Sequence, residues 1–560
     1  MKKMQNFDVF GAILWGGALT LALETSVQAQ TPAPDAGQTL RELQQQAPPT
    51  QPTGTTSLSV PTDTATTADT SVRFPVREVR VQGNQQLSGD LIAPLVAPLN
   101  GRETSLGELR QAAAQITALY RAKGFVVSRA FVPAQEITDG VVYITVLEGR
   151  LSSTDIQNQT KNKTPVLQRI VSAQALEGKV IRTAELDREL LLIADLPAVG
   201  NVTGALKPGQ EIGTSDLVIT AAPGKSYNGS VSLDNYGNRY TGENRLGGNI
   251  DLNSPFNIGD RLSIRGTVTD EDLQYGRIAY DLPANGDGLR LGVSYSASQY
   301  DLGQEFKNLD ATGTAKTSGL NATYPLVRGL NANVWLRGAL DARELRDEVR
   351  FTDVNSSKSV KAGLFDAYGD VADSIGGGAY STWRASATFG DLAINNAKAL
   401  AVDQSGPQAS GNYRKLELAA TRLQALAPRT SLYGSANLQW AGKNLDSSEK
   451  LSLGGAYGVR AYPQGEAVGD SGWLANIEVR QELTAGIQGA LFYDYGRVEY
   501  NKEPFAPDDN DRSLKGYGAS LKLSYRDISA KSTIAWRDGE AATSAPDRSP
   551  RFWLEISTLF

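Results

Sequence analysis

The residue types that most often carry catalysis or bind transition metals are missing from this sequence. The chain of 560 residues contains no histidine and no cysteine. This removes disulfide scaffolds, thiol nucleophiles, histidine-based triads and most transition-metal sites. Any serine nucleophile would lack its usual base, so an enzyme is the weakest functional class. We therefore expect no catalytic residue, no metal and no cofactor.

Charge and composition narrow the remaining classes. A net charge of -6 argues against nucleic-acid binding, which needs a basic face or stripe. The sequence also contains no nucleotide-binding motif. The 56 glycines and 21 tyrosines suit many strands and turns. The mean hydropathy of -0.30 is polar for a membrane protein, but transmembrane barrels are an exception because every second strand residue faces a wet lumen.

The first 29 residues have the features of a signal peptide. Lys2 and Lys3 precede an apolar stretch from Val9 to Leu23, and residues 27–29 match a cleavage-site pattern. The apolar stretch is short for a membrane-spanning helix. Later segments show no candidate for such a helix. A membrane-embedded part would therefore have to be a closed barrel, in which all strand backbone groups are paired.

Residues 30–72 are rich in Pro, Gln, Thr and Ala, which predicts a flexible linker. Within it, residues 35–46 contain no proline and Asp35 can cap a short helix. The apolar side of this helix consists of Leu40 and Leu43 alone. Such a thin side cannot anchor a helix in a core, so we expect the helix to float or to rest in a polar cavity.

Residues 73–224 contain an internal repeat. Residues 130–137 (AFVPAQEI) match residues 205–212 (ALKPGQEI), and at the same offset residues 143–146 match residues 218–221. One register covers both blocks, which indicates a duplicated unit.

Each copy is expected to fold as strand, helix, helix, strand, strand. In the first copy, Ser105 and Glu108 form a capping box that opens a helix, and Gly124 ends it. Turn residues separate the strand patterns that follow. The predicted units are residues 73–150 and 151–224. Their expected later elements are strands at 125–131 and 141–147 in the first copy, and helices at 166–170 and 186–193 in the second.

Residues 225–560 alternate between apolar and polar side chains. Leu291, Val293 and Tyr295, for example, alternate with Gly292 and Ser294. Period two with one apolar face fits strands that lie between lipid and lumen. A strand with its turn takes roughly twenty residues, which predicts an antiparallel transmembrane β-barrel of about sixteen strands. A soluble sandwich or propeller would also alternate.

The C-terminus favours the barrel over a soluble sheet. Phe560 ends the chain, and Thr558, Ile556, Leu554 and Phe552 precede it at steps of two residues. A soluble protein rarely ends on a hydrophobic strand, because termini usually fray. We interpret Phe560, Ile556 and Leu554 as a barrel assembly signal, read by the barrel assembly machinery during biogenesis.

This arrangement resembles the two-partner secretion transporters, the accessory proteins that export large haemolysins and adhesins. The resemblance covers nearly the whole mature chain: a short helix, a linker, two POTRA-type repeats and a barrel. Residues 120–125 (YRAKGF) and 324–327 (YPLV) are similar to family motifs. The resemblance implies a protein of a Gram-negative-type outer membrane, in contact with its lipid and with the POTRA units in the periplasm.

Two segments resemble the lumen motifs of that family. Residues 459–462 (VRAY) are similar to the VRGY/F motif at the tip of a long loop folded back into the barrel, and residues 492–496 (FYDYG) match its F-x-D-x-G strand motif. By position, the resemblance implies that Arg460 pairs with Asp494. The alternative is a loop arginine in solvent without a partner. The candidate residues are Val459, Arg460, Ala461 and Tyr462 on the loop, and Phe492, Asp494 and Gly496 on the strand.

The motif departs from the family pattern at one position. Ala461 stands where the family has glycine. If the backbone there required a positive φ, alanine would be strained.

The function that the resemblance implies is export of an unfolded partner protein. The POTRA units would capture it by β-augmentation. The partner would then thread the lumen, displacing the loop with Arg460 and a pore-plugging helix whose candidate residues are Asp35, Leu40, Arg41 and Leu43. The resemblance further implies that folding of the exported protein outside the cell drives transport.

Three alternatives remain open. An outer-membrane protein insertase of the same superfamily shares the POTRA units, the barrel and the loop motif, although two units with a helix and linker favour secretion. A passive porin or receptor would leave the periplasmic repeat unexplained. The POTRA units could also be scaffolding alone, since fold by itself does not give function.

Overall fold

A computed structural model describes residues 34–44, 56–60, 72–352, 354–507 and 509–560. The expected signal peptide and most of the expected linker lie outside these residues. In the part of the chain that is described, no helix is long and apolar enough to cross a membrane.

The first repeat unit is a small α/β domain. Its three-stranded sheet has the order β3-β6-β5, and α2 and α3 pack on it around a core that includes Ile116, Tyr120 and Ile144. The predicted capping box forms, with Ser105 accepting from the Glu108 amide and the Glu108 carboxylate accepting from the Ser105 amide. The elements are β2 (Arg73–Val76), β3 (Glu78–Gln82), α2 (Gly89–Val96), η1 (Ala97–Leu99), β4 (Arg102–Ser105), α3 (Leu106–Ala122), β5 (Arg129–Phe131) and β6 (Val141–Leu147).

The strand predicted at residues 125–131 is shorter than expected. Only β5, from Arg129, pairs with β6. Phe125 is buried in the core, and the Ser128 amide donates to its carbonyl in a turn. The strand therefore begins only at Arg129, after the turn that contains buried Phe125.

The second unit has the predicted order of strand, helix, helix, strand, strand. Its elements are β7 (Arg150–Asn158), α4 (Thr164–Gln174), α5 (Thr183–Ala194), β8 (Val199–Pro208) and β9 (Thr214–Pro223). A further strand, β1 (Thr56–Ser59), comes from the expected linker and adds in parallel to β8. This segment forms a strand here because Leu58 packs on the core of this unit beside Gly204.

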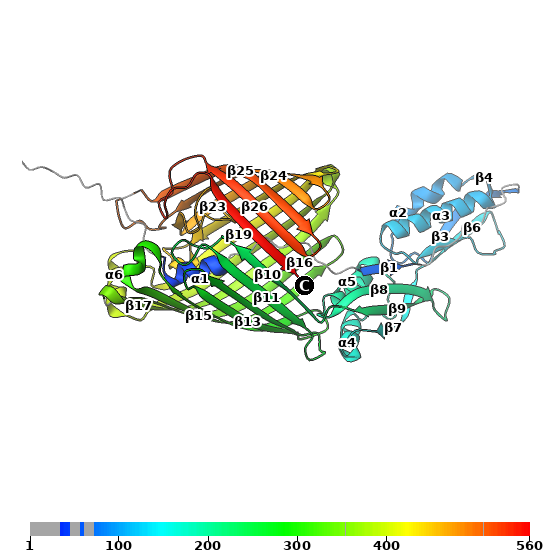
Figure 1. The fold of residues 1–560 in the computed structure, drawn as a ribbon. Coiled ribbons are helices and arrows are strands. Elements are labelled where there is room, and N and C mark those ends of the chain that lie inside the picture. Colours follow the sequence, from blue (N-terminus) through cyan, green and yellow to red (C-terminus); the bar gives the residue numbers. More distant parts are fainter. Residues whose placement is uncertain (1–33, 45–55, 61–71, 353, 508) are drawn as a thin grey trace, which may run out of the picture. The chain divides into compact units, whose positions relative to one another are not determined.

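A closed barrel of sixteen antiparallel strands follows, which confirms the expected fold (Figure 1). The first strand, β10, closes the barrel by pairing with the last, β27. The strands are β10 (Tyr227–Asp234), β11 (Arg245–Asn253), β12 (Arg261–Thr269), β13 (Gln274–Pro283), β14 (Arg290–Asp301), β15 (Ala311–Arg328), β16 (Ala332–Val349), β17 (Val354–Asp373), β18 (Ala379–Ile394), β19 (Gly411–Ala427), β20 (Thr430–Ala441), β23 (Ser471–Thr484), β24 (Ile487–Glu499), β25 (Asp511–Tyr525), β26 (Ile528–Arg537) and β27 (Arg551–Leu559).

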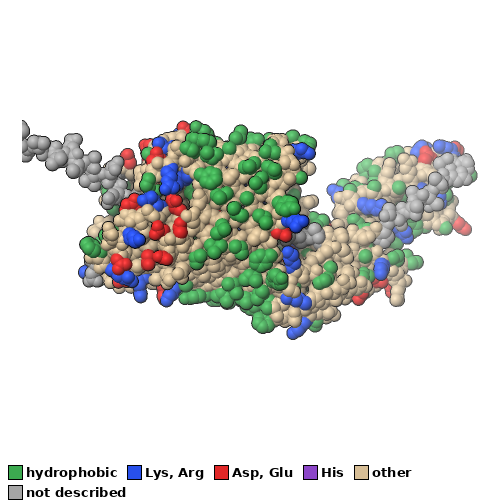
Figure 2. All heavy atoms as spheres, viewed as in Figure 1, with side chains coloured by type: hydrophobic (Ala, Val, Ile, Leu, Met, Phe, Trp, Pro, Cys, Tyr) green, Lys and Arg blue, Asp and Glu red, His purple; other side chains and the backbone are tan. Residues whose placement is uncertain are grey.

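The outer face of the barrel is apolar. Large hydrophobic side chains such as Leu320, Leu340 and Phe365 are exposed on it, and Figure 2 shows hydrophobic side chains spread over the wall. Apolar side chains on an outer wall match lipid rather than water. On β27, Leu554 and Ile556 are exposed on this face, while Trp553, which precedes them, is buried.

Candidate functional site: the barrel lumen

A long loop between β20 and β23, residues 442–470, returns to the inner wall of the barrel. Its tip packs through Leu453, Val459 and Tyr462 against wall residues that include Phe492 and Leu514. The loop carries η5 (Ser447–Glu449) and the short strands β21 (Leu451–Ser452) and β22 (Val468–Gly469), which pair with each other.

The loop tip can turn tightly because a glycine stands where its two backbone segments come closest together. The Val459 amide donates to the Leu453 carbonyl at 2.7 Å. A Cβ at Gly458 would lie 2.0 Å from that same carbonyl oxygen, a distance no side chain tolerates. The turn therefore presents the next residue, Arg460, to the wall.

Arg460 is held by Asp494 of β24 in a two-point interaction. Its Nε donates to Asp494 Oδ2 at 2.9 Å and its Nη2 donates to Oδ1 at 2.6 Å. The Arg460 backbone amide also donates to Oδ2, at 3.0 Å. Arg460 is 4% exposed and Asp494 is fully buried. A planar guanidinium suits such bidentate recognition of a carboxylate.

A second carboxylate completes the site. Arg460 Nη1 donates to Glu478 Oε1 of β23 at 2.6 Å, and Arg480 donates to the other oxygen of Glu478 at 2.7 Å. Asn476 Nδ2 donates to Asp494 Oδ1 at 2.8 Å. We call Arg460, Asp494 and Glu478 the lumen latch. The sequence reasoning missed Glu478, although its alternation with Asn476 on one strand face was the available signal.

Aromatic side chains enclose the arginine. The Arg460 guanidinium carbon lies 3.4 Å from the centroid of the Phe492 ring, a cation–π arrangement. Trp553 Nε1 of β27 donates to the Arg460 carbonyl at 2.7 Å. The loop tip is therefore tied to the last strand of the barrel as well as to β23 and β24. Trp553 was not anticipated from the sequence.

The other residues of the two motifs make mainly packing contacts with the barrel wall. Ala461 is not among the described residues with a positive φ, so alanine is unstrained there. Its Cβ points at Gly516 of β25, where an added Cβ would lie 2.5 Å away. Tyr462 is buried and its hydroxyl donates to the Glu540 carbonyl at 2.8 Å. Gly496 leaves room for Leu453, which a Cβ would meet at 2.8 Å.

Helix α1 (Ala36–Gln44) lies within the barrel (Figure 1). Asp35 caps it by accepting from the Gln38 amide at 2.9 Å, and also accepts from Ser447 Oγ of the long loop at 2.6 Å. Leu40 is buried in a small apolar cluster with wall residues, and Leu43 packs against that cluster. The helix thus rests on a few apolar side chains and is otherwise held by polar contacts.

Charged side chains connect α1 to the wall and to the loop. Arg41 donates to Glu417 of β19 at 2.6 Å, and Lys415 of β19 lies 3.2 Å from Glu417. Lys415 also lies 2.9 Å from Glu449 of the loop, which Arg343 of β16 contacts as well. This chain of charges, which we call the plug network, joins α1, the loop and two wall strands.

The expected assembly signal lies on the outer wall. The Phe560 amide and carbonyl pair with Gly229 of β10 at 3.1 and 3.2 Å. Ile556 and Leu554 face outward from β27. These residues lie at the seam where the first and last strands close the barrel.

Comparison with known proteins gives two family matches. Residues 213–523, more than half of the chain, match the model of the haemolysin secretion/activation protein ShlB/FhaC/HecB. Residues 74–149 match the ShlB-type POTRA domain.

Individual relatives agree with these matches. The chain is 28% identical to the heme/hemopexin transporter protein HuxB of Haemophilus influenzae, over 100% of both chains. It is 24% identical to the outer membrane transporter CdiB of Dickeya dadantii, over 85% of this chain and 84% of that one. The structure of CdiB from Escherichia coli superposes with a TM-score of 0.71 at 23% identity, over 88% of this chain and 93% of that one.

Proposed function

Because the chain belongs to the haemolysin secretion/activation family ShlB/FhaC/HecB, we propose that its barrel is the outer-membrane pore through which an unfolded, secreted partner protein leaves the periplasm. The protein is an outer-membrane transporter of the two-partner type, as its resemblance to these transporters implied. In this proposal α1 and the loop tip close the resting pore and must both move during export.

The proposal rests on the kind of contact that holds α1 in the barrel lumen. Helix α1 is held in the barrel largely by polar contacts, which water can replace when the helix leaves. The plug network links α1 to the loop through Glu417, Lys415 and Glu449. A segment bound in this way can be displaced without unfolding the wall.

Capture of the partner is assigned to the two POTRA units. In the described part of the chain, β5 and β7 each end a sheet and have a partner strand on one side only. A free strand edge can bind an extended chain through backbone hydrogen bonds. Because β1 already pairs with β8, the free sheet edges are those of β1, β3, β5 and β7, and one of these four edges would dock the partner.

Assembly of the barrel is assigned to its C-terminal strand. Phe560, Ile556 and Leu554 face outward beside the β10–β27 seam, where the barrel assembly machinery could hold the strand before closure. No nucleotide site takes part in the proposed cycle, and folding of the partner outside the cell supplies the driving force.

The test is a comparison of secreted and outer-membrane proteomes with and without this protein. Loss of one large secreted protein, with other barrels at normal abundance, is the expected result. A general fall in many outer-membrane barrels would instead identify an insertase and contradict the proposal.

A further inference from the structure

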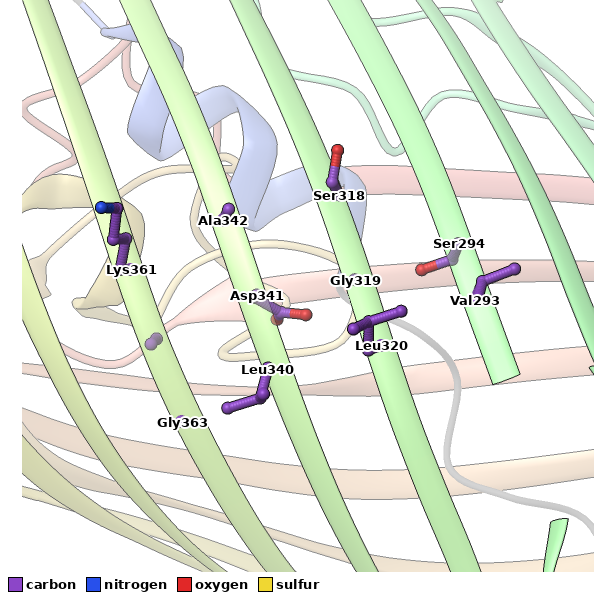
Figure 3. Close-up of a pocket in the computed structure, with 11 residues that line it drawn as sticks. Val293, Ser294, Ser318, Gly319, Leu320, Leu340, Asp341, Ala342, Lys361 and Gly363 are labelled. Atoms are coloured by element: carbon purple, nitrogen blue, oxygen red, sulfur yellow. The ribbon is translucent and has the colours of Figure 1, made fainter. Parts of the chain in front are cut away.

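A groove on the outer wall and a buried carboxylate in the long loop differ in how specific their contacts are. The groove crosses β14 to β17 and is lined by Leu320 and Leu340 (Figure 3). Its Lys361 stands directly opposite Asp391 of β18, so its apolar lining carries no distinct charge. Glu466 of the long loop, by contrast, is a buried charge with a defined set of donors.

Glu466 is fully buried. Its carboxylate accepts from the backbone amides of Thr543 at 2.9 Å and Ser544 at 2.8 Å, and also from the hydroxyl groups of both residues. Arg512 Nη2 of β25 lies 2.6 Å from Glu466 Oε1. Two consecutive amides, two hydroxyls and one guanidinium thus compensate a single buried charge, as a carboxylate away from water requires.

The amide and hydroxyl donors come from the loop between β26 and β27, residues 538–550, which we call the outer loop. The barrel strands are antiparallel, and the first of them, β10, starts on the side of the POTRA units. The loop after β10, and every second loop from there, therefore lies at the opposite end of the barrel. The long loop and the outer loop both belong to this series, so both lie at the end that faces the outside of the cell.

The outer loop packs on the tip of the long loop. The Glu540 carbonyl accepts from the hydroxyl of buried Tyr462 at 2.8 Å, and half-buried Ala542 packs against the apolar cluster of the tip. The side chain of Ala541, next to it, is exposed. Because the tip lies in the lumen, these contacts place the outer loop over the tip, at the mouth of the pore.

The segment that contains Glu466 also touches helix α1. A Cβ at Gly465 would lie 2.6 Å from Gln38 Nε2 and 2.9 Å from Glu42 Oε1 of the helix. Adjacent residues of one short segment therefore contact the helix in the lumen and the outer loop at the mouth.

We propose that Glu466 is a positioning residue that holds the outer loop closed over the mouth of the pore while α1 is docked. This inference rests on the proposed function, in which the lumen is the path of export. When α1 leaves, the segment at residues 464–466 loses its contact with the helix, and the attachment of the outer loop through Glu466 weakens. The mouth of the pore then opens only after the plug has been released.

The test is the reactivity of single cysteines in the outer loop, since the chain has none of its own. Ala542→Cys reports closure because this side chain packs on the tip, and Ala541→Cys is the matched control on the exposed side. A membrane-impermeant maleimide is added to intact cells that produce the full chain, and only protein with a folded barrel is counted. Ala542→Cys should react more slowly than Ala541→Cys.

Glu466→Gln removes the charge and keeps the shape. In either orientation of the new amide its NH2 group faces a donor, because each oxygen of Glu466 accepts from a backbone amide. Labelling of Ala542→Cys should rise about 10-fold, as loss of a hydrogen bond to a charged group predicts, and labelling of Ala541→Cys should not change.

Glu243→Gln is the matched charge control. It removes an exposed ion pair between Glu243 and Arg548 of the outer loop, so it should change labelling of Ala542→Cys little. A rise as large as that in Glu466→Gln would overturn the proposal, because any loss of charge would then loosen the outer loop.

Two further variants complete the test. Thr543→Ala with Ser544→Ala removes two donors from the outer loop and serves if Glu466→Gln does not assemble; labelling of Ala542→Cys should rise about 3-fold, as loss of neutral donors predicts. Removal of residues 35–44 takes away α1 and should also raise labelling.

Unchanged labelling in Glu466→Gln, or in the double variant if Glu466→Gln does not assemble, would overturn the positioning role. Unchanged labelling without α1 would overturn the link between the plug and the outer loop. Neither result would decide whether the protein exports a partner, because the proteome comparison tests that separately.

Discussion

The loop tip and helix α1 both occupy the lumen, but the loop tip is held there by a buried ion pair and α1 by a partly exposed one. The latch pair Arg460–Asp494 has side-chain exposures of 5% and 0%, and an apolar cluster surrounds it. The pair Arg41–Glu417 has exposures of 27% and 28%. Breaking a buried pair leaves an unpaired charge away from water, whereas a partly exposed pair exchanges its partner for water at small cost.

This difference predicts the order of events during export. Helix α1 should leave first and often, because water replaces most of its contacts. The loop tip should stay on the wall until the passing chain or a larger rearrangement of the barrel displaces it. The plug network still couples the two elements through Glu449, so release of α1 weakens one attachment of the loop.

The largest effect is expected from Arg460→Ala. Removing this guanidinium leaves Asp494 and Glu478 buried without their partner, at a cost of about 3–5 kcal/mol to the attachment of the loop. Hydrogen–deuterium exchange should increase across residues 453–467, and export should differ from that of the unaltered protein at normal protein levels.

The matched control is Arg480→Ala, which also removes a partner of Glu478. The Arg480 side chain is 26% exposed, so its loss should change exchange little. If Arg460→Ala behaves like this control, or leaves export unchanged, the latch does not hold the loop.

Removal of residues 35–44 should open the resting pore. Because α1 fills part of the lumen, single-channel conductance in planar bilayers should rise severalfold without any change in barrel assembly. Unchanged conductance would mean that α1 does not obstruct the pore. It would contradict the account in which α1 is the weakly held element that closes it.

A smaller effect is expected from Arg41→Ala. It removes one partly exposed ion pair, so the open fraction of the channel should rise about 5-fold, corresponding to ~1 kcal/mol. High salt should produce a similar rise in the unaltered protein, because it screens such pairs. An effect as large as deletion of the whole helix would contradict weak, distributed binding.

The smallest effect concerns pH. Glu42 of α1 accepts from Asn238 in the loop between β10 and β11, outside the membrane-spanning strands. Burial raises the pKa of Glu42 from 4.5 to about 7, although hydrogen bonds from Gln38 and Asn238 oppose the shift. The docked helix therefore holds a proton that the released helix loses, and docking weakens as pH rises from about 4.5 to about 7.

Channel recordings across that pH range should show a rising open fraction in the unaltered protein. Glu42→Gln cannot ionise and should reduce the slope. An undiminished slope in this variant would assign the pH response to other groups.

Much of this architecture was predictable because its patterns are local. Alternation along each strand predicted the barrel and the approximate number of strands, and the duplicated blocks around Pro133 and Pro208 predicted two similar units. Asp35 was recognisable as a helix cap from its position alone. Each of these inferences needs only a short window of sequence.

What was missed depends on contacts between distant segments. Trp553 reaches Arg460 only after the last strand has closed the barrel, and Glu478 joins the latch because β23 lies beside β24. The strand containing Leu58 forms within a segment of linker composition because it pairs with β8 of the second POTRA unit and Leu58 packs on that unit's core beside Gly204. No local sequence pattern indicates contacts between segments that lie so far apart in the chain.

The central claim is that α1 must leave its resting place before a protein can pass. The chain has no cysteine, so a single disulfide can be introduced cleanly. Gly37→Cys with Ser447→Cys suits this purpose, because a Cβ at Gly37 would lie 2.4 Å from Ser447 Oγ, and small shifts bring this pair to disulfide geometry. Arg343 and Lys415 hold the helical turn that contains Ser447 against the wall through Glu449.

The measurement is export of the partner protein by this double variant, oxidised and then reduced, with each single variant as control. We expect the oxidised protein to block export, reductant to restore it, and both single variants to export normally. Normal export by fully oxidised protein would show that the chain passes with α1 in place, and would contradict the account.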